Sequence, residues 1–374
     1  MISSPRSLHS LSRMGSPDST APGGSRRHSQ EATRTLPAPA DAVRFPAAFS
    51  VLPLAAAALL ALAATQAQAQ PTSSWRVATA QPAAASTLWC GLAPLEVEPV
   101  GQGLSLTFNG KTQMVMPAIS ASGARYTAPD GTNTEFWNKG ELATLTWDGQ
   151  TPPTCAPAGA VVTPFRASGN EPFWSVEYDG WTLTISQPGS KSAPLPAEVA
   201  ERSAAQTVIT SGQGAEAFRL VVRDGVCQDT MSGMPHPQTV RLEHAGTTWQ
   251  GCGGDPGRLL QGVEWQILTI DGQTLPAGSP VPTIQFGTDG RLSGFAGCNR
   301  FMGSYTLGGE GLSSSQLAST RMACVGPGDA LETRILGHLE QLQGFEAPAA
   351  GTLILRTGQG TLGARLAPSP NAPK

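Results

Sequence analysis

The sequence predicts a mainly β protein: a small antiparallel β-barrel, then a second β-rich domain, then an α+β domain with one helix. Gly and Pro, with 43 and 32 copies in 374 residues, favour short strands joined by turns over long helices. Short runs of alternating polar and apolar residues recur at close spacing, as the strands of small barrels and sandwiches do. Six cysteines divide between three segments, two in each, which predicts three separately cross-linked domains.

The charge of the chain narrows the class of partner. The net charge is −3 and the pI is about 6.0, which excludes a broadly basic nucleic-acid binder. Residues 70–374 carry 18 basic and 24 acidic side chains, a net charge of −6. We therefore expect no nucleic-acid partner, and a weak preference for a basic protein.

The first 69 residues predict export. Residues 1–42 are polar, rich in Ser, Pro and Arg, and without periodicity, so no fold is expected there. Arg44 precedes an apolar run, Ala47–Ala64, and Ala67-Gln68-Ala69 then supplies a small-x-small cleavage site. The alternative is a transmembrane anchor, which Pro53 and the high Ala content disfavour. We expect signal cleavage near Ala69 and a mature protein in the periplasm or outside the cell.

No cysteine follows the apolar run at the position that a lipid anchor requires, because the first cysteine of the chain is Cys90. We therefore expect no stable membrane anchor after cleavage. An exported protein forms disulfides by default, and the absence of any C-x-x-C disfavours zinc ribbons and thioredoxin-like sites.

The cysteines and the Pro/Ala/Gly-rich runs predict the domain boundaries. Linker-like runs lie at Gln81–Ser86, Thr151–Val162 and Gly253–Gly262. They divide the chain into an extension with signal peptide (1–69), a linker (70–87), and domains at 88–155, 163–257 and 259–374, with residues 156–162 as a second linker. The predicted disulfides are Cys90–Cys155, Cys227–Cys252 and Cys298–Cys324. Each closure contributes about 3–4 kcal/mol in the chain-entropy model. A free, buried pair is the alternative.

The first domain reads as a run of hairpins. Leu104–Phe108 is an expected strand, Asn109-Gly110 is a strong hairpin turn, and the chain returns along Lys111–Met116. Further strands are expected at Arg125–Thr127, Thr134–Trp137 and Leu142–Trp147. A core this small is marginal, which is why a disulfide between its two ends makes physical sense.

Two motifs in this domain carry a family resemblance. They are Ala121–Tyr126, with the sequence ASGARY, and Glu135–Gly140, with the sequence EFWNKG, followed by Ala143-Thr144-Leu145 and flanked by the two cysteines. The domain resembles the membrane-bound inhibitor of c-type lysozyme, the MliC family. The resemblance implies an antiparallel β-barrel that inserts two loops into the lysozyme cleft, where Ser122 and Lys139 contact the two catalytic carboxyl groups. The expected lysozyme-binding residues are Ser122, Gly123, Tyr126, Trp137, Lys139 and Gly140. The family is usually a lipoprotein, and this chain lacks the cysteine that would carry the lipid.

The chemistry of these residues fits a lysozyme cleft independently. One catalytic carboxyl of lysozyme stays protonated in an apolar pocket and the other stays ionised. The Lys139 ammonium can pair with the ionised group, and the Ser122 hydroxyl can hydrogen-bond the other in either protonation state. Residues 88–155 carry three basic and six acidic side chains, a net charge of −3 that would attract a cationic lysozyme. The alternative is that both motifs form ordinary hairpin turns with a solvated lysine.

The sequence of the middle domain gives fewer indications of function than that of the first. Strands are expected at Trp174–Tyr178, Trp181–Ser186, Thr207–Thr210, Phe218–Val222, Thr239–Glu243 and Thr248–Cys252. The segments at 169–174, 227–235 and 251–254 resemble an uncharacterised family of bacterial envelope domains, which implies no activity. A Ser/His/Asp hydrolase built from Ser232, His236 and Asp229 lacks any recognised sequence context. We favour the interpretation that Asp229 and Ser232 satisfy the backbone of a turn.

The third domain combines strands with one helix. Strands are expected at Trp265–Leu268, Thr283–Phe286 and Leu353–Leu355, with a hairpin turn at Asp289-Gly290. A helix is expected from near Asp329 to Leu342, because Asp329 is a suitable cap and apolar residues recur at helical spacing. They are Leu331, Ile335, Leu339 and Leu342.

This domain resembles the META/HslJ family. The resemblance rests on Gly294–Phe301, Gly303-x-Tyr305, Thr320-Arg321-Met322-x-Cys324 and Glu332. It implies a META-type α+β domain of bacterial envelopes, linked with heat and drug tolerance. Asn299 and Arg300 could form a ligand patch, but we favour the interpretation that they tie down a loop beside a disulfide.

Three functions are consistent with these sequence features. The first is an exported multi-domain envelope protein that binds and inhibits c-type lysozyme. The second is a periplasmic stress-tolerance or structural envelope protein without inhibition. The third is an enzyme, which we rank last because the chain has no H-E-x-x-H, phosphate loop or dinucleotide motif. We therefore expect no catalytic residue, cofactor or metal.

Overall fold

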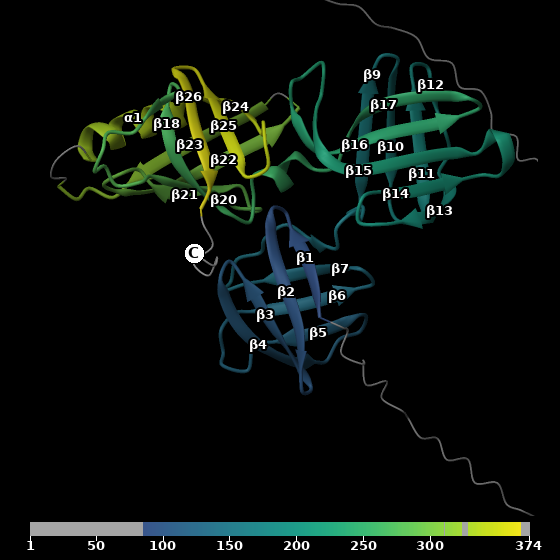
Figure 1. Ribbon diagram of the computed structural model, residues 1–374, viewed down its shortest axis with the longest axis horizontal. Coiled ribbons are helices and arrows are strands. Elements are labelled where there is room, and N and C mark those ends of the chain that lie inside the picture. The colour runs from purple at the N-terminus through teal and green to yellow at the C-terminus, as the bar shows by residue number, and fades with distance from the viewer. Residues whose placement is uncertain (1–84, 310, 324–327, 368–374) are drawn as a thin grey trace, which may run out of the picture. The chain divides into compact units, whose positions relative to one another are not determined.

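The computed structural model describes residues 85–309, 311–323 and 328–367. The predicted signal peptide with its cleavage site at Ala69, and Cys324, lie outside these residues. No helix in the described ranges is long and apolar enough to cross a membrane. The described chain is mainly β, as the composition predicted, and its strands form three separate sheets (Figure 1).

The first sheet is a closed antiparallel barrel in which each strand pairs with its neighbours in sequence. Alternate residues of β2 point inward, and the interior fills with apolar side chains such as Leu95, Leu106 and Leu145, none of them exposed to solvent. The strands are β1 (Ser86–Cys90), β2 (Ala93–Val100), β3 (Gly103–Phe108), β4 (Lys111–Ala118), β5 (Ala124–Thr127), β6 (Glu135–Lys139), β7 (Leu142–Thr146) and β8 (Cys155–Ala156).

The sheet of the middle domain also closes on itself, because β10 pairs with both β9 and β11. Trp174, fully buried, lies at its core among aliphatic and aromatic side chains. The strands are β9 (Phe165–Asn170), β10 (Phe173–Tyr178), β11 (Thr182–Gln187), β12 (Ser190–Lys191), β13 (Leu195–Arg202), β14 (Thr207–Ser211), β15 (Phe218–Gln228), β16 (Pro235–His244) and β17 (Thr247–Gly253).

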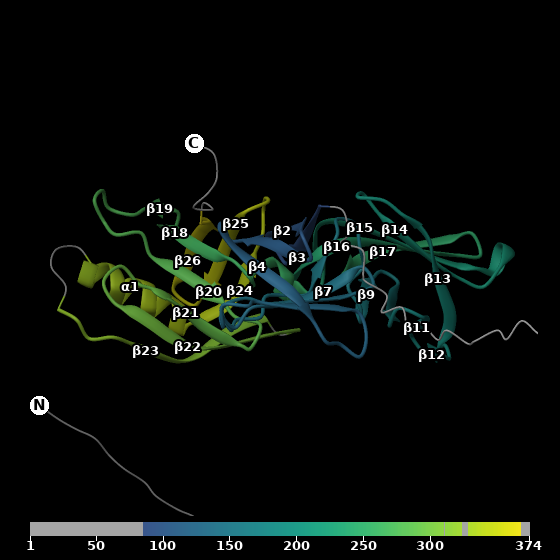
Figure 2. The same cartoon turned by 90° about the horizontal axis from the view of Figure 1, so that it is seen from below.

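The third sheet carries the one α-helix of the described chain. The helix, α1 (Gly328–Glu340), packs against β23 and β26 (Figure 2). It buries Leu331, Ile335 and Leu339. It ends two residues before the predicted end, since Leu342 begins the next strand. The strands are β18 (Glu264–Ile270), β19 (Gln273–Thr274), β20 (Thr283–Phe286), β21 (Arg291–Phe295), β22 (Arg300–Gly308), β23 (Gly311–Ser319), β24 (Leu342–Glu346), β25 (Thr352–Thr357) and β26 (Gly360–Leu366).

Two predicted disulfides are confirmed. Cys90 joins Cys155 across the paired strands β1 and β8, and Cys227 joins Cys252. Cys298 is also disulfide-bonded, while Cys324, its predicted partner, lies outside the described residues.

Part of the linker-like run at 253–262 has regular structure. Residues Pro256–Leu259 form a 3₁₀ turn, which Asp255 caps by accepting a hydrogen bond from the Gly257 amide at 2.8 Å. Leu259 and Leu260 are buried in the core of the third domain. Two adjacent leucines have enough apolar surface to draw this segment into a core, which the Gly content of the run concealed.

Candidate functional site

The β5–β6 hairpin brings the two motifs of the first domain together. Arg125 pairs with Trp137 and Ala124 with Asn138, so the segment before β5 and the turn after β6 lie at the same end of the hairpin. Gly123 has a φ of +68°, and a Cβ there would lie 2.2 Å from the Asn138 carbonyl oxygen. Only glycine permits this close approach, which places the Ser122 loop directly against β6.

The backbone of the Ser122 loop is held by two donors. The Ser120 hydroxyl donates to the Ser122 carbonyl oxygen at 2.6 Å, and the Trp137 indole N–H donates to the same oxygen at 2.9 Å. The Ser122 residue is exposed, and its hydroxyl has no hydrogen-bond partner among the described residues. The loop is therefore ordered while its hydroxyl remains available.

Lys139 is the one basic side chain of the described barrel without a carboxylate partner. Lys111 lies 3.7 Å from Asp148, and Arg125 donates to Glu135 at 2.6 Å. The hydrogen bond and the charge of Glu135 raise the pKa of Arg125 above its ordinary value. The exposed Lys139 ammonium instead lies 3.5 Å from the centroid of the Trp137 ring.

The other residues predicted for lysozyme binding divide into two groups. Trp137 is partly exposed, and Gly140, with a φ of +67°, forms the turn after Lys139. Tyr126 is only 8% exposed, and its ring packs 6.3 Å from that of Phe136 in the barrel core. The alternation along β5 turns Tyr126 inward, so its ring belongs to the barrel core and its predicted contact with lysozyme stays a prediction.

The sequence reasoning missed one exposed residue beside this site. Ile119, immediately before the Ser122 loop, is 97% exposed. An apolar side chain in a polar turn region is a signal that could have been found from the sequence.

The middle domain brings two of its signature segments together without forming a hydrolase site. Asn170 Nδ2 donates to Asp229 Oδ2 at 3.0 Å, and the Ser232 hydroxyl donates to Asp229 Oδ1 at 2.8 Å. His236 Nδ1 lies 2.9 Å from the Gly254 carbonyl oxygen. Burial alone would raise the pKa of Asp229, but hydrogen bonds from Ser232 and Asn170 outweigh it and hold the pKa below the usual value. Asp229 therefore stabilises a turn, as we favoured.

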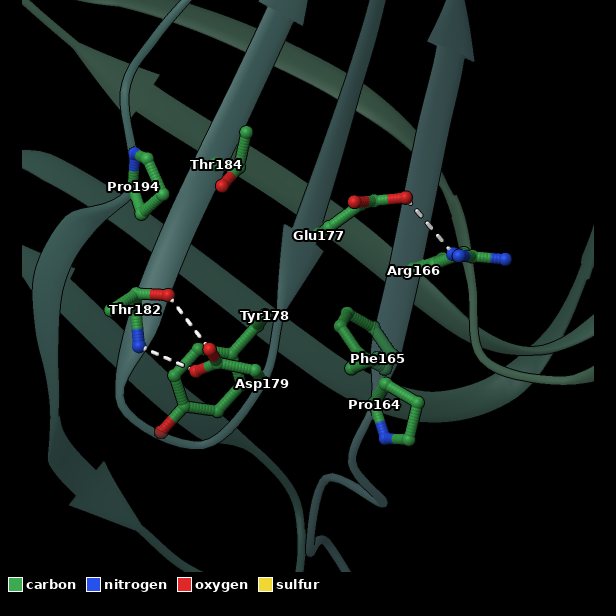
Figure 3. A pocket seen from close by; sticks show the side chains of 9 residues that line it. All are labelled: Pro164, Phe165, Arg166, Glu177, Tyr178, Asp179, Thr182, Thr184 and Pro194. Carbon is green, nitrogen blue, oxygen red and sulfur yellow. Dashed lines mark hydrogen bonds and ion pairs between the residues drawn. The ribbon is translucent and has the colours of Figure 1, made fainter.

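A shallow pocket of about 200 Å³ lies on the same domain (Figure 3). Asp179 accepts hydrogen bonds from the backbone and hydroxyl of Thr182, and Arg166 pairs with Glu177 at 3.1 Å (Figure 3). These charged groups are already used within the fold. The part of the chain that the structure describes also holds no cluster of three or more His, Cys, Asp or Glu side chains suited to a metal.

In the third domain Asn299 is 4% exposed and fully engaged. Its backbone N–H and its Nδ2 each donate to Glu332 Oε2 at 2.9 Å. Its Oδ1 accepts from the Thr320 hydroxyl at 2.8 Å and from the Met322 amide at 2.9 Å. Asn299 thus joins the 320–322 segment to α1, which agrees with the loop-tying interpretation; Arg300 is exposed.

Comparison with known proteins agrees with the sequence motifs. Residues 90–153 match the family described as membrane-bound lysozyme-inhibitor of c-type lysozyme, and residues 258–368 match the META domain. The matched families leave the middle domain without a name.

No curated protein matches the chain. Two solved structures are similar to parts of it. One, an NMR structure of a protein, is 32% identical, with coverage of 30% of this chain and 95% of that one and a TM-score of 0.26. The other, an NMR structure of a protein from Burkholderia xenovorans, is 33% identical, with coverage of 30% and 86% and a TM-score of 0.25.

Proposed function

We propose, from the premise that the chain carries a lysozyme-inhibitor domain and a META domain, that it is an exported envelope protein that binds and inhibits c-type lysozyme. Ser122 and Lys139 enter the active-site cleft of the enzyme. The protein is not itself an enzyme in this proposal. It acts in the periplasm or outside the cell, after signal cleavage near Ala69.

The observation that carries the proposal is that two neighbouring exposed groups at one end of the β5–β6 hairpin lack a polar partner. The Ser122 hydroxyl has no hydrogen-bond partner and the Lys139 ammonium has no carboxylate partner among the described residues. The Ser122 hydroxyl and the Lys139 ammonium both face solvent, and the Ser122 loop lies against β6, which ends at Lys139. A Cβ on Gly123 would lie 3.1 Å from Lys139 Cγ, which measures how close the two segments are. A cationic donor beside a neutral donor complements a cleft with one ionised and one protonated carboxyl.

Two charged features of the barrel favour a lysozyme partner, one at long range and one at contact. The acidic barrel attracts a cationic enzyme from beyond contact distance, an effect that salt screens over about 10 Å. The Lys139 ammonium acts only at contact, where it meets the ionised carboxylate inside the cleft. The disulfides of the first two domains fit an oxidising compartment outside the cytoplasm.

The test is a titration of purified mature protein against a c-type lysozyme, with a goose-type lysozyme as the comparison enzyme. We expect loss of c-type activity at micromolar inhibitor and little effect on the goose-type enzyme, whose cleft differs. Lys111→Ala is the matched control for Lys139→Ala, because each substitution removes one positive charge from the barrel. Lys111 begins β4, at the end of that strand away from the Ser122 loop. Full c-type activity at micromolar protein would overturn the proposal in favour of a structural or stress-tolerance role.

A further inference from the structure

We infer that Trp137 is a positioning residue that holds both binding segments, the Ser122 loop and the Lys139 side chain, in the arrangement that engages lysozyme. The inference rests on the proposed function and gives Trp137, already expected near the lysozyme contact, a role in which it acts through two other residues. Two independent contacts of the Trp137 side chain carry it, one through the indole N–H and one through the face of the ring.

The first contact fixes the Ser122 loop. The Trp137 indole N–H reaches from β6 to the Ser122 carbonyl oxygen at 2.9 Å. Ser120 Oγ donates to the same oxygen, so both of its lone pairs are used. A carbonyl held from two sides prevents the peptide from rotating, and the Ser122 side chain therefore stays on the exposed side of the loop.

The second contact orders the Lys139 side chain. Trp137 and Lys139 are two residues apart on β6 and project from the same face of the strand. The ammonium lies 3.5 Å from the ring centroid, within the range where the ring quadrupole attracts a cation. A lysine otherwise has large rotamer freedom, which binding would have to remove.

The ion pair of the neighbouring Arg125 explains why Lys139 is the cation that contacts the Trp137 ring. Arg125 lies directly opposite Trp137 in the β5–β6 register, where it could compete for the ring. Glu135 holds the Arg125 guanidinium at 2.6 Å instead. Lys139 is thus the cation on the ring, and one indole couples it to the Ser122 loop.

This arrangement predicts an effect on affinity more than on folding. A binding surface ordered in advance loses less conformational entropy on association. Because a single side chain orders both segments, the contributions of Ser122 and Lys139 to binding should not be independent. A residue that served only the barrel core would change the melting temperature and leave the inhibition constant unchanged.

The test is a pair of substitutions with a matched control. Trp137→Phe removes the N–H and keeps part of the ring face, whereas Trp137→Leu removes both. Trp147→Phe is the control, because Trp147 is 7% exposed and packs 5.7 Å from the ring of Phe108 in the same barrel. We expect Trp137→Phe to raise the inhibition constant about tenfold and Trp137→Leu to raise it further. Trp147→Phe should lower the melting temperature and leave the inhibition constant near wild type.

Two further measurements test the order of the Ser122 loop in the free protein and the energetic coupling between Trp137 and Lys139. Hydrogen exchange at the Ser122 and Gly123 amides should accelerate in Trp137→Phe and not in Trp147→Phe. Lys139→Ala should weaken inhibition less in the Trp137→Leu background than in wild type. Wild-type inhibition by folded Trp137→Phe and Trp137→Leu would overturn the inference and leave the proposed function intact. Absence of inhibition by the wild-type protein would overturn the proposed function, and the inference with it.

Discussion

The Ser122 loop of the first barrel and the Asn299 loop of the third domain are alike in sequence and opposite in use. Each places a short polar side chain near a glycine of positive φ, Gly123 at +68° and Gly297 at +108°. In the barrel the Ser122 hydroxyl is exposed and unpaired among the described residues. In the third domain Asn299 is buried, and both polar atoms of its side chain are bonded. A signature residue therefore points to a partner only when the fold leaves its hydrogen-bonding capacity unused.

The difference has a physical cause in what covers each loop. The helix α1 places the Glu332 carboxylate against Asn299, and a buried polar pair must be satisfied internally. No helix lies among residues 86–156, so the end of the β5–β6 hairpin stays open to solvent. The following substitutions test this contrast, in order of expected effect.

Lys139→Ala should weaken lysozyme inhibition most. In the complex the ammonium would be buried against an ionised carboxylate, and its removal leaves that charge unpaired, which costs about 2–5 kcal/mol. Inhibition titrations measure the change, after circular dichroism and thermal melts show that the variant is folded. Lys139→Arg should rescue only in part, because a planar guanidinium does not replace a compact ammonium. A folded Lys139→Ala with the wild-type inhibition constant would mean that Lys139 is a solvated turn residue.

Asn299→Ala should have the opposite profile, with a loss of stability and no loss of inhibition. The change removes the Asn299 Nδ2 donor from Glu332, which is 9% exposed and keeps the backbone N–H of residue 299, and it removes the Oδ1 acceptor from the Thr320 hydroxyl; loss of such buried hydrogen bonds costs about 1–3 kcal/mol. Denaturant unfolding of the full chain measures it. Arg300→Ala is the adjacent exposed control and should be near neutral. Weaker inhibition by folded Asn299→Ala would break the contrast between the two loops.

Ser122→Ala should weaken inhibition less than Lys139→Ala and leave stability unchanged. A hydroxyl bonded to a carboxyl contributes about 1 kcal/mol net, rising to about 3 if that carboxyl is charged. The same titration measures the effect, with Ser120→Ala for comparison, since Ser120 holds the loop backbone. A drop in the melting temperature of Ser122→Ala would show that its hydroxyl serves the fold.

The smallest effect concerns pH and the third domain. Burial lowers the pKa of His338. The negative charge of Asp271 raises this pKa and offsets the burial only in part, and the positive charge of Arg334 lowers it further. The folded pKa therefore lies below the unfolded value of about 6.5, and the neutral imidazole, bonded to Thr357 Oγ1 at 2.9 Å, is favoured. His338 therefore contributes its full stabilisation above about pH 6.5, and this contribution is lost as the pH drops through the folded pKa.

Melting temperatures measured between pH 7.5 and 5 should show this loss, and His338→Gln should reduce its slope. The described barrel contains no histidine, so the same range should leave its own unfolding transition without a histidine-driven change. An unchanged slope in His338→Gln would assign the pH dependence to other groups.

Much of the fold follows from local patterns. The hairpin at Asn109-Gly110, the strand at Thr283–Phe286 and the helix near Asp329 were predictable, because turn chemistry and periodicity act within a few residues. Two strands were harder to predict. β2 alternates apolar and polar residues, but prolines lie near both of its ends and argue against a strand. β13 is almost wholly exposed and bulged, so its pairing with β11 and β14 defines it. Tertiary pairing overrides local preference at such positions.

The sequence by itself determined the β class, the pairing of the cysteines confirmed in the first two domains, and the two family motifs. Only the tertiary structure decided what the motif residues do. Strand register brought Ser122 to Trp137 and turned Tyr126 inward, and the packing of α1 placed Glu332 against Asn299. These contacts join residues 15 and 33 positions apart, and their geometry depends on which face each strand presents. Residue type states what a side chain can bond, whereas burial and register determine whether that capacity is spent within the fold or left for a partner.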